Sequence, residues 1–125
     1  MRIEDGVKLD FDDVLICPKR SCIESRANVN LIRTFKTLNS KTELIGVPVI
    51  VSNLDTTGTI AMCQALAEFA MFTCLHKFYP NEILINFFKN DPTSKYAFYT
   101  MGITNKDVEK LKLVSAETKL DKICI

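Results

Sequence analysis

The stretch Val47-Pro-Val-Ile-Val-Ser52, with Asn53-Leu-Asp-Thr-Thr-Gly58-Thr59 directly after it, decides which fold this chain is expected to adopt. A second stretch of the same kind, Met71-Phe-Thr-Cys-Leu75, is followed by His76-Lys77. Both apolar runs have the length and composition of buried strands. Because the carboxyl ends of parallel strands meet at one edge of a sheet, the polar groups that follow them are expected on a shared rim.

A strand–helix alternation continues from these two stretches to the last residue. We expect strands at residues 47–52, 71–75, 96–100 and 121–125, and helices at residues 59–70, 80–90 and 105–116. Thr57 or Thr59 can cap the first helix, and Thr104 with Asp107 forms a capping box for the third. This order indicates right-handed βαβ units and a parallel sheet. A flavodoxin-like sheet would show the same alternation, whereas the absence of a Gly-rich phosphate loop disfavours a Rossmann fold.

Residues 1–46 lack a long helical period and are interpreted as an extended arm, not as a separate domain. Phe11, Val14, Leu15 and Ile16 are expected to form a short strand or a buried turn, and residues 29–35 a short strand. Basic residues gather in this part of the chain. They are Lys19, Arg20, Arg26, Arg33, Lys36 and Lys41. They form either a solvated surface or a site for a phosphorylated ligand.

Composition and charge exclude several classes of protein. The 125 residues are 47% hydrophobic and 25% charged, which is typical of a globular domain. A net charge of +1 does not suggest nucleic-acid binding. The five cysteines include no Cys-x-x-Cys pair and there is one histidine, so a zinc site is not expected. No apolar run approaches the roughly 18 residues of a membrane span, and the sequence begins without an apolar signal core. We therefore expect no membrane partner and a reducing, cytoplasmic location.

Lys77 is the strongest candidate for chemistry on the expected rim. A lysine at the end of a strand can donate to a phosphate or a carboxamide, although a solvated loop lysine has the same sequence context. Asn53 and Asp55 flank Leu54 at the end of the preceding strand. The Asp55 carboxylate is expected either to orient the following backbone or to act on a substrate.

Four segments together carry a resemblance to a known family. They are Lys8-Leu-Asp-Phe-Asp-Asp-Val-Leu-Ile-Cys-Pro-Lys-Arg-Ser21, Ser25-Arg26, the stretch from Asn53 to Thr59, and His76-Lys-Phe-Tyr79. In this order they resemble the N-terminal part of GMP reductase. They are similar, more loosely, to the related IMP dehydrogenase, which usually has Thr-Glu where Gly58 and Thr59 stand here. The resemblance implies the N-terminal portion of a (β/α)8 TIM barrel, with about four parallel strands in residues 47–125 after the arm of residues 1–46. Since a complete barrel takes about 250 residues, the chain is expected to hold an incomplete barrel domain.

The resemblance also implies an activity, which is the NADPH-dependent reductive deamination of GMP to IMP and ammonia. The family's nucleophilic cysteine lies in a Gly-rich loop expected beyond residue 125, and Cys17 and Cys22 lack that context. No catalytic residue is therefore assigned in this chain, and the 125 residues alone are expected to be inactive. The site for the monovalent cation (K⁺) of the complete enzyme is likewise expected outside it.

The family's cofactor contacts fall on three residues of this chain. The resemblance places NADPH against Lys77, and against Ser25 and Arg26 from a neighbouring subunit, so that a homo-oligomer, expected to be a tetramer, shares the site. It places Asn53, Leu54 and Asp55 on the side of the substrate, GMP or IMP. His76 is expected to be a structural neighbour of Lys77.

Two other interpretations stay open beside the reductase. One is an IMP dehydrogenase. The other is a non-catalytic short protein that binds full-length reductase subunits and modulates them. The sequence does not separate that protein from an N-terminal fragment of a reductase.

Overall fold

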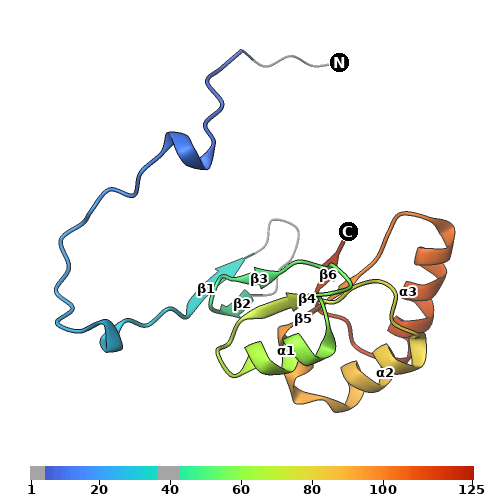
Figure 1. Cartoon of the computed structure of the whole chain (residues 1–125). Helices are drawn as coiled ribbons and strands as arrows, with labels where there is room; N and C mark the ends of the chain where they lie inside the picture. The colour runs from blue at the N-terminus through green and yellow to red at the C-terminus, as the bar shows by residue number, and fades with distance from the viewer. Residues whose placement is uncertain (1–4, 37–42) are drawn as a thin grey trace.

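A computed structural model describes residues 5–36 and 43–125, so Lys41 of the basic group lies outside the described residues. It contains an antiparallel hairpin and a parallel four-stranded sheet (Figure 1). The hairpin strands are β1 (Arg33–Lys36) and β2 (Glu43–Gly46). The sheet strands are β3 (Ile50–Val51), β4 (Phe72–Cys74), β5 (Ala97–Thr100) and β6 (Ile123–Cys124). They lie in the order β3-β4-β5-β6, which confirms the expected parallel sheet in sequential order.

Three α-helices alternate with these strands. They are α1 (Ile60–Ala67), α2 (Asn81–Asn90) and α3 (Asn105–Glu117). One buried cluster joins Ala97 and Tyr99 of β5 to side chains from all three helices. The helical members are Cys63, Leu84, Phe87 and Val114. The helices therefore cover one face of the sheet, and in Figure 1 they follow one another around it, away from the hairpin.

The first helix begins and ends at different residues from those expected, and the second begins one residue later than expected. α1 ends at Ala67 instead of residue 70 because Ala70 adopts a left-handed conformation with φ of 55°. Its N–H and that of Met71 return to the carbonyls of Ala67 and Leu66, which closes the helix. Pro80, expected inside α2, instead precedes it in an extended conformation.

The predicted caps of α1 and α3 are present. Thr59 caps α1, and its side chain accepts a hydrogen bond from the N–H of Met62. Thr104 and Asp107 form the expected capping box at the start of α3. Both caps therefore start their helices immediately after a strand-end loop.

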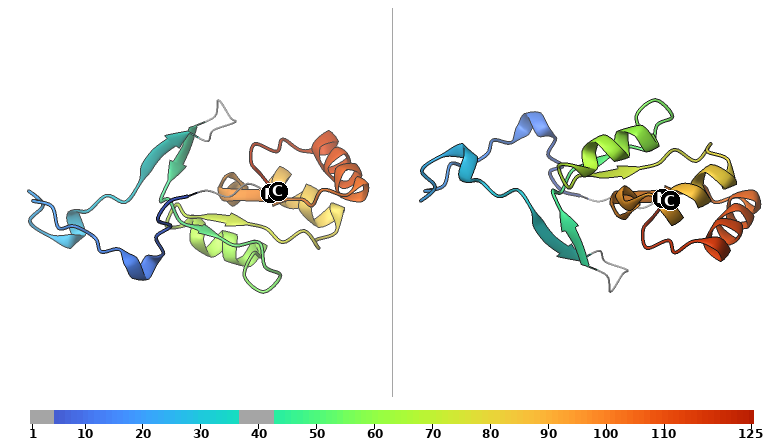
Figure 2. Two further views of the ribbon diagram at one scale, coloured as in Figure 1. Left: turned by 90° about the horizontal axis from the view of Figure 1, so that it is seen from above. Right: turned by 90° about the horizontal axis from the view of Figure 1, so that it is seen from below.

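The expectation of a strand or buried turn at Phe11, Val14, Leu15 and Ile16 is wrong. A short 3₁₀ helix, η1 (Phe11–Asp13), begins there because Asp10 and Asp13 satisfy each other's backbone groups in a capping box. Leu15 is 96% exposed and Ile16 is 97% exposed, so nothing in the described part of the chain buries this turn. The described residues up to Ile32 run as an arm away from the sheet (Figure 2).

The hairpin that follows the arm was foreseen only in part. β1 overlaps the strand expected at residues 29–35, whereas β2 was not expected. Phe35 packs edge-on against Phe72, with ring centroids 6.2 Å apart, and so brings the hairpin to the beginning of β4. Within the described residues, no helix is both long enough and apolar enough to span a bilayer.

Candidate functional site

The loops that follow β3, β4 and β5 form one rim of the sheet. Parallel pairing places their starting points at the same edge. The first two loops are also joined directly, since the N–H of His76 donates to the carbonyl of Gly58 at 2.7 Å. The structure therefore brings the expected rim groups of residues 53–59 and 76–77 into one neighbourhood.

Gly58 allows this close approach. A Cβ atom at position 58 would overlap the carbonyl oxygen of Cys74 and would lie 2.9 Å from the Cα of Asn53. The N–H of Gly58 donates to the carbonyl of Leu54 at 2.6 Å, so the loop turns back on itself before α1 begins. A side chain at this position would push the first loop away from β4.

Asn53, Leu54 and Asp55 lie at the outer surface of this turn, and all three are exposed. Leu54 is 60% exposed. No hydrogen bond or ion pair joins the Asp55 carboxylate to another residue that the structure describes. The three side chains are therefore available to a ligand at the rim.

The loop from His76 to Tyr79 is held by several independent contacts. The His76 and Tyr79 rings stack with their centroids 4.0 Å apart and their planes 14° apart. The N–H of Phe78 donates to Nδ1 of His76 at 3.3 Å. The hydroxyl of Tyr79 accepts a hydrogen bond of 3.0 Å from the N–H of Ile60, the first residue of α1. His76 is thus a structural neighbour of Lys77, as expected.

Lys77 projects from this ordered loop into solvent. Its side chain is exposed, and its Nζ lies 5.7 Å from the centroid of the Phe78 ring. Asp107 supplies a fixed negative charge nearby, because the N–H and the hydroxyl of Thr104 donate to it at 3.1 and 2.6 Å. These hydrogen bonds, with a smaller contribution from the positive charge of Lys77, hold the pKa of Asp107 below its ordinary range.

Lys110 of α3 completes the support of this loop. Its Nζ donates to the backbone carbonyl of Lys77 at 2.8 Å and to that of Tyr79 at 2.5 Å. Burial lowers the pKa of Lys110, and the neighbouring Asp107 offsets part of this effect. The sequence indicated Asp107 only as a helix cap and gave no signal for Lys110. The contact spans more than thirty residues and follows from how α3 packs.

Ser25 and Arg26 do not join Lys77 within one chain. They start the short 3₁₀ helix η2 (Arg26–Asn28), where the Ser25 hydroxyl accepts a hydrogen bond from the N–H of Ala27 at 3.3 Å. Both residues are exposed. The arm that carries them lies at the opposite end of the molecule from the loop that carries Lys77 in Figures 1 and 2.

Cys63 of α1 and Cys74 of β4 are poor nucleophiles. Burial raises the pKa of Cys63 to about 11. Burial and the neighbouring Cys124 thiol raise the pKa of Cys74 to about 12. Cys17 and Cys22 are exposed in the arm, away from the rim. Among the described residues, no group of three or more His, Cys, Asp or Glu side chains could hold a metal ion.

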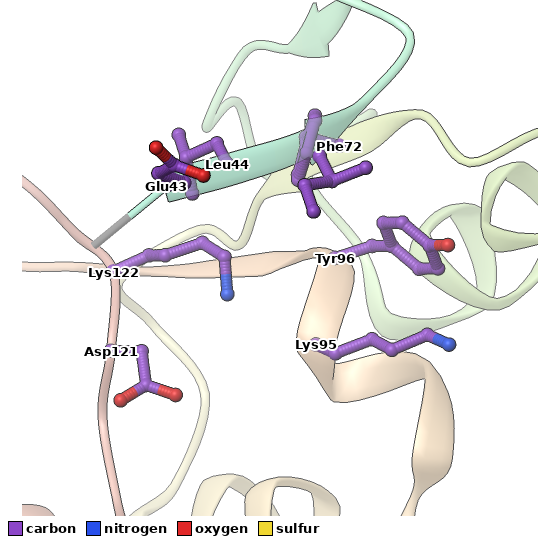
Figure 3. Close-up of a pocket in the computed structure, with 8 residues that line it drawn as sticks. Glu43, Leu44, Phe72, Lys95, Tyr96, Asp121 and Lys122 are labelled. Carbon is purple, nitrogen blue, oxygen red and sulfur yellow. The ribbon is translucent and has the colours of Figure 1, made fainter. Parts of the chain in front are cut away.

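A cavity of about 380 Å³ lies at the other end of the strands (Figure 3). Glu43 and Leu44 of the hairpin, Lys95 and Tyr96 before β5, and Lys122 before β6 contribute to its lining. Figure 3 shows the Lys122 ammonium directed into the space between these elements, and burial lowers the pKa of this group. In (β/α) barrels this end of the strands serves stability, whereas the carboxyl ends serve binding and catalysis. The rim is therefore the better candidate site.

The rim offers a cation on an ordered loop together with exposed amide and carboxylate groups. Such a set can bind and orient an anionic or amide-bearing ligand, because a lysine ammonium donates up to three hydrogen bonds.

Comparison with curated proteins gives a consistent result over the whole chain. The chain is 41% identical over 128 residues to a GMP reductase of Tolumonas auensis, a match that covers 100% of this chain and 37% of the relative. It is 41% identical over 126 residues to GMP reductase 1 of Rattus norvegicus, covering 99% of this chain and 36% of the relative. A GMP reductase of Yersinia pestis is 42% identical over 128 residues, again with 37% of its length covered.

The chain is therefore homologous, from end to end, to proteins named GMP reductase. It spans little more than a third of the length of these relatives, at 36–37%. No protein-family model matches it.

Proposed function

We propose that this chain is the N-terminal, cofactor-binding part of a GMP reductase. The observation that carries the proposal is the placement of Lys77. In a chain homologous to GMP reductases, this exposed cation stands on a strand-end loop fixed by contacts from α1, α3 and the preceding loop. An ammonium presented in this way is suited to a phosphate or to the carboxamide of a nicotinamide.

The proposed reaction is the reductive deamination of GMP. NADPH supplies a hydride to C2 of the purine, the amino group on that carbon takes up a proton and leaves as ammonia, and the products are IMP and NADP⁺. This chain's part is to bind and orient: Lys77 contacts the cofactor, while Asn53, Leu54 and Asp55 line the purine side. The nucleophilic cysteine, the K⁺ site and most of the phosphate site of GMP belong to sequence outside these 125 residues.

The residues of the rim and arm fit a nicotinamide dinucleotide. The guanidinium of Arg26 is exposed and can grip a phosphate through two parallel hydrogen bonds. It lies far from Lys77 within one chain, which supports a cofactor site shared between subunits. We therefore propose a homotetramer in which the arm of one subunit, with Ser25 and Arg26, meets the rim of the next.

A chimera tests this proposal directly. The chain replaces the segment of the Tolumonas auensis GMP reductase with which it aligns, and the purified chimera receives GMP and NADPH. We expect NADPH oxidation, followed by absorbance, in step with IMP formation. The same chimera with IMP and NAD⁺ controls for dehydrogenase activity. A folded chimera that reduces no GMP would overturn the proposal.

The structure also supports a second candidate, a non-catalytic module that docks on reductase subunits. Strand β6 pairs on one side only among the described residues, Ile123 on it is 42% exposed, and Ile125 just after it is 82% exposed. Mixing the chain with the complete relative separates the two candidates. A docking module would form a stable mixed complex and change the relative's rate, whereas the reductase part would restore activity only when joined to the missing sequence.

A further inference from the structure

We propose that Lys110 is a positioning residue that holds the loop from His76 to Tyr79 and thereby orients Lys77. This inference deepens the proposed function and rests on it, because Lys77 is the residue proposed to meet the cofactor. The ammonium of Lys110 is directed at the backbone carbonyls of the loop and is engaged there. It would therefore act through Lys77.

The geometry is that of a clamp between two elements. Lys110 lies on the second turn of α3, and its single ammonium donates to two carbonyls of the preceding strand-end loop, those of Lys77 and Tyr79. These carbonyls flank Phe78, so the loop is gripped on both sides of its tip. Three N–H groups on a lysine ammonium suffice for two such bonds with one to spare.

The neighbouring charge of Asp107 favours the cationic form of Lys110. Lys110 is half-buried, and burial alone would favour the neutral amine, but the Asp107 carboxylate one turn earlier opposes this. Asp107 is itself fixed by Thr104 and also acts on the charge of Lys77. On the first two turns of α3, the Asp107 carboxylate thus lies near the side chain of Lys77, and the Lys110 ammonium binds the backbone carbonyl of Lys77.

The other contacts of the loop do not replace the clamp. The hydroxyl of Tyr79 ties the far end of the loop to α1, and the N–H of His76 ties its beginning to Gly58. Among the described residues, the hydrogen bond to the carbonyl of Lys77 comes from Lys110. Loss of the Lys110 ammonium would therefore leave the carbonyls of Lys77 and Tyr79 without this link to α3, and the bond from the N–H of Phe78 to His76, which lies within the loop, would not replace it.

The test compares three substitutions in the full 125-residue chain. Lys110→Met removes the ammonium but keeps an apolar stem, Lys110→Arg keeps a cationic donor, and Lys112→Met is the matched control at an exposed lysine of the same helix. NMR then measures amide exchange at His76, Phe78 and Ile60, together with the ¹³C shifts of the Lys77 and Tyr79 carbonyls. Titration with NADPH measures cofactor affinity in the same samples.

We expect Lys110→Met to speed exchange of the loop amides about tenfold or more and to move both carbonyl shifts. NADPH affinity should fall by a similar factor. Lys110→Arg should keep the amide exchange rates and the NADPH affinity close to those of the wild type. Lys112→Met should change neither the exchange rates nor the affinity. Unchanged exchange and unchanged carbonyl shifts in Lys110→Met would overturn the inference.

Failure of the proposed function gives a different pattern. In that case the wild-type chain and a Lys77→Met variant bind NADPH equally, or neither binds it. The exchange and carbonyl data still decide whether Lys110 holds the loop. A response there supports the clamp and rejects only its role toward the cofactor.

Discussion

Lys77 shows how an exposed side chain can belong to an ordered site. Its ammonium is in solvent, while its backbone and its two neighbours in the loop are fixed by hydrogen bonds and ring stacking. Surface lysines in mobile loops lose side-chain and backbone freedom on binding a ligand. Here the structure has already fixed the backbone, so a ligand would have to order only the side chain.

A substitution at Lys77 should separate cofactor binding from substrate binding. In the chimera, we expect Lys77→Met to raise the Michaelis constant for NADPH about tenfold to a hundredfold, because one charge-assisted hydrogen bond contributes roughly 1.5–3 kcal/mol. The constant for GMP should change little. Steady-state kinetics with each substrate varied provide the measurement. Lys95→Met, at an exposed lysine before β5, is the control. Equal effects from both substitutions would return Lys77 to the role of a solvated loop residue.

Asp107 should make the stability of the folded chain depend on pH at acid pH. Its folded-state pKa lies below its ordinary value of 3.8, mainly because the Thr104 side chain donates to it. Its stabilisation is therefore present above pH 3.8 and is lost as the pH falls through the lower, folded-state pKa. We expect the urea midpoint of unfolding of Asp107→Asn to lie below that of the wild type at pH 6. The difference between the two midpoints should be smaller at pH 2.5. Asp91, whose pKa is also lowered, contributes equally to both chains and cancels in the comparison. A constant difference across this range would contradict the assignment.

At the scale of single elements, the strand-end loops depend on Gly58. We expect Gly58→Ala to destabilise the chain by about 1–3 kcal/mol, because the new methyl group meets backbone atoms of Asn53, Ser52 and Cys74 that cannot move independently. Gly6→Ala is the matched control, since a methyl group there has no atom within 4 Å. Urea unfolding of the two variants measures the difference. Similar midpoints for both variants would show that the first loop can move away from β4 at little cost.

The sequence predicted the existence of these elements better than their contacts. The runs at residues 47–52 and 71–75 indicated buried strands; β4 is buried as expected, whereas β3 is short and Ile50 on it is exposed. Thr104 with Asp107 marks the start of α3 through a local capping box. The end of α1 depends on the left-handed conformation of Ala70, for which alanine gives no signal. The turn at η1 also escaped prediction, because its apolar residues are exposed where their composition suggested burial.

The same limit applies to the candidate site. Lys77 could be found because it directly follows a strand, and strand ends of parallel sheets are where sites form. Lys110 could not be found from the sequence, because its role depends on how closely α3 packs against a loop more than thirty residues earlier in the chain. The pairing of Ser25 and Arg26 with the rim stays a prediction, since within one chain the two sites lie apart.

At the scale of the whole molecule, the described sheet has two open edges. β3 and β6 each pair with one neighbour, and Ile50 and Ile123 on these strands are 47% and 42% exposed. Unpaired strand edges with exposed apolar side chains favour pairing with another chain. The isolated 125 residues should therefore associate in solution.

We expect this association to depend on β6. Sedimentation velocity should show the average mass rising with concentration, and Ile123→Lys should reduce the rise because a charge on an edge strand opposes pairing. Val108→Lys is the control, because Val108 is an apolar residue of α3 that is 37% exposed. A wild-type chain that stays monomeric at every concentration would contradict the open-edge interpretation.

The isolated chain should also fail to reduce GMP. Burial favours the thiol form of Cys63 and Cys74, and Cys17 and Cys22 lie in the arm away from the rim, so none of these four is placed to supply a thiolate there. The chain is purified free of host reductase and mixed with GMP and NADPH, and the absorbance of NADPH is followed. We expect no change beyond that in a sample without GMP. Steady oxidation coupled to IMP would show that one of these cysteines is catalytic.

The sequential order of β3, β4, β5 and β6 also bears on the order in which the elements can fold during synthesis. Each strand–helix unit can dock on the one made before it, so folding can advance from the first unit to the last as the ribosome delivers the chain. Lys77, however, precedes the residue that clamps its loop by 33 positions. At about 5–20 residues per second, the loop waits roughly two to seven seconds for α3 to emerge. The part of the sheet that presents Lys77 is thus made early and becomes fixed late.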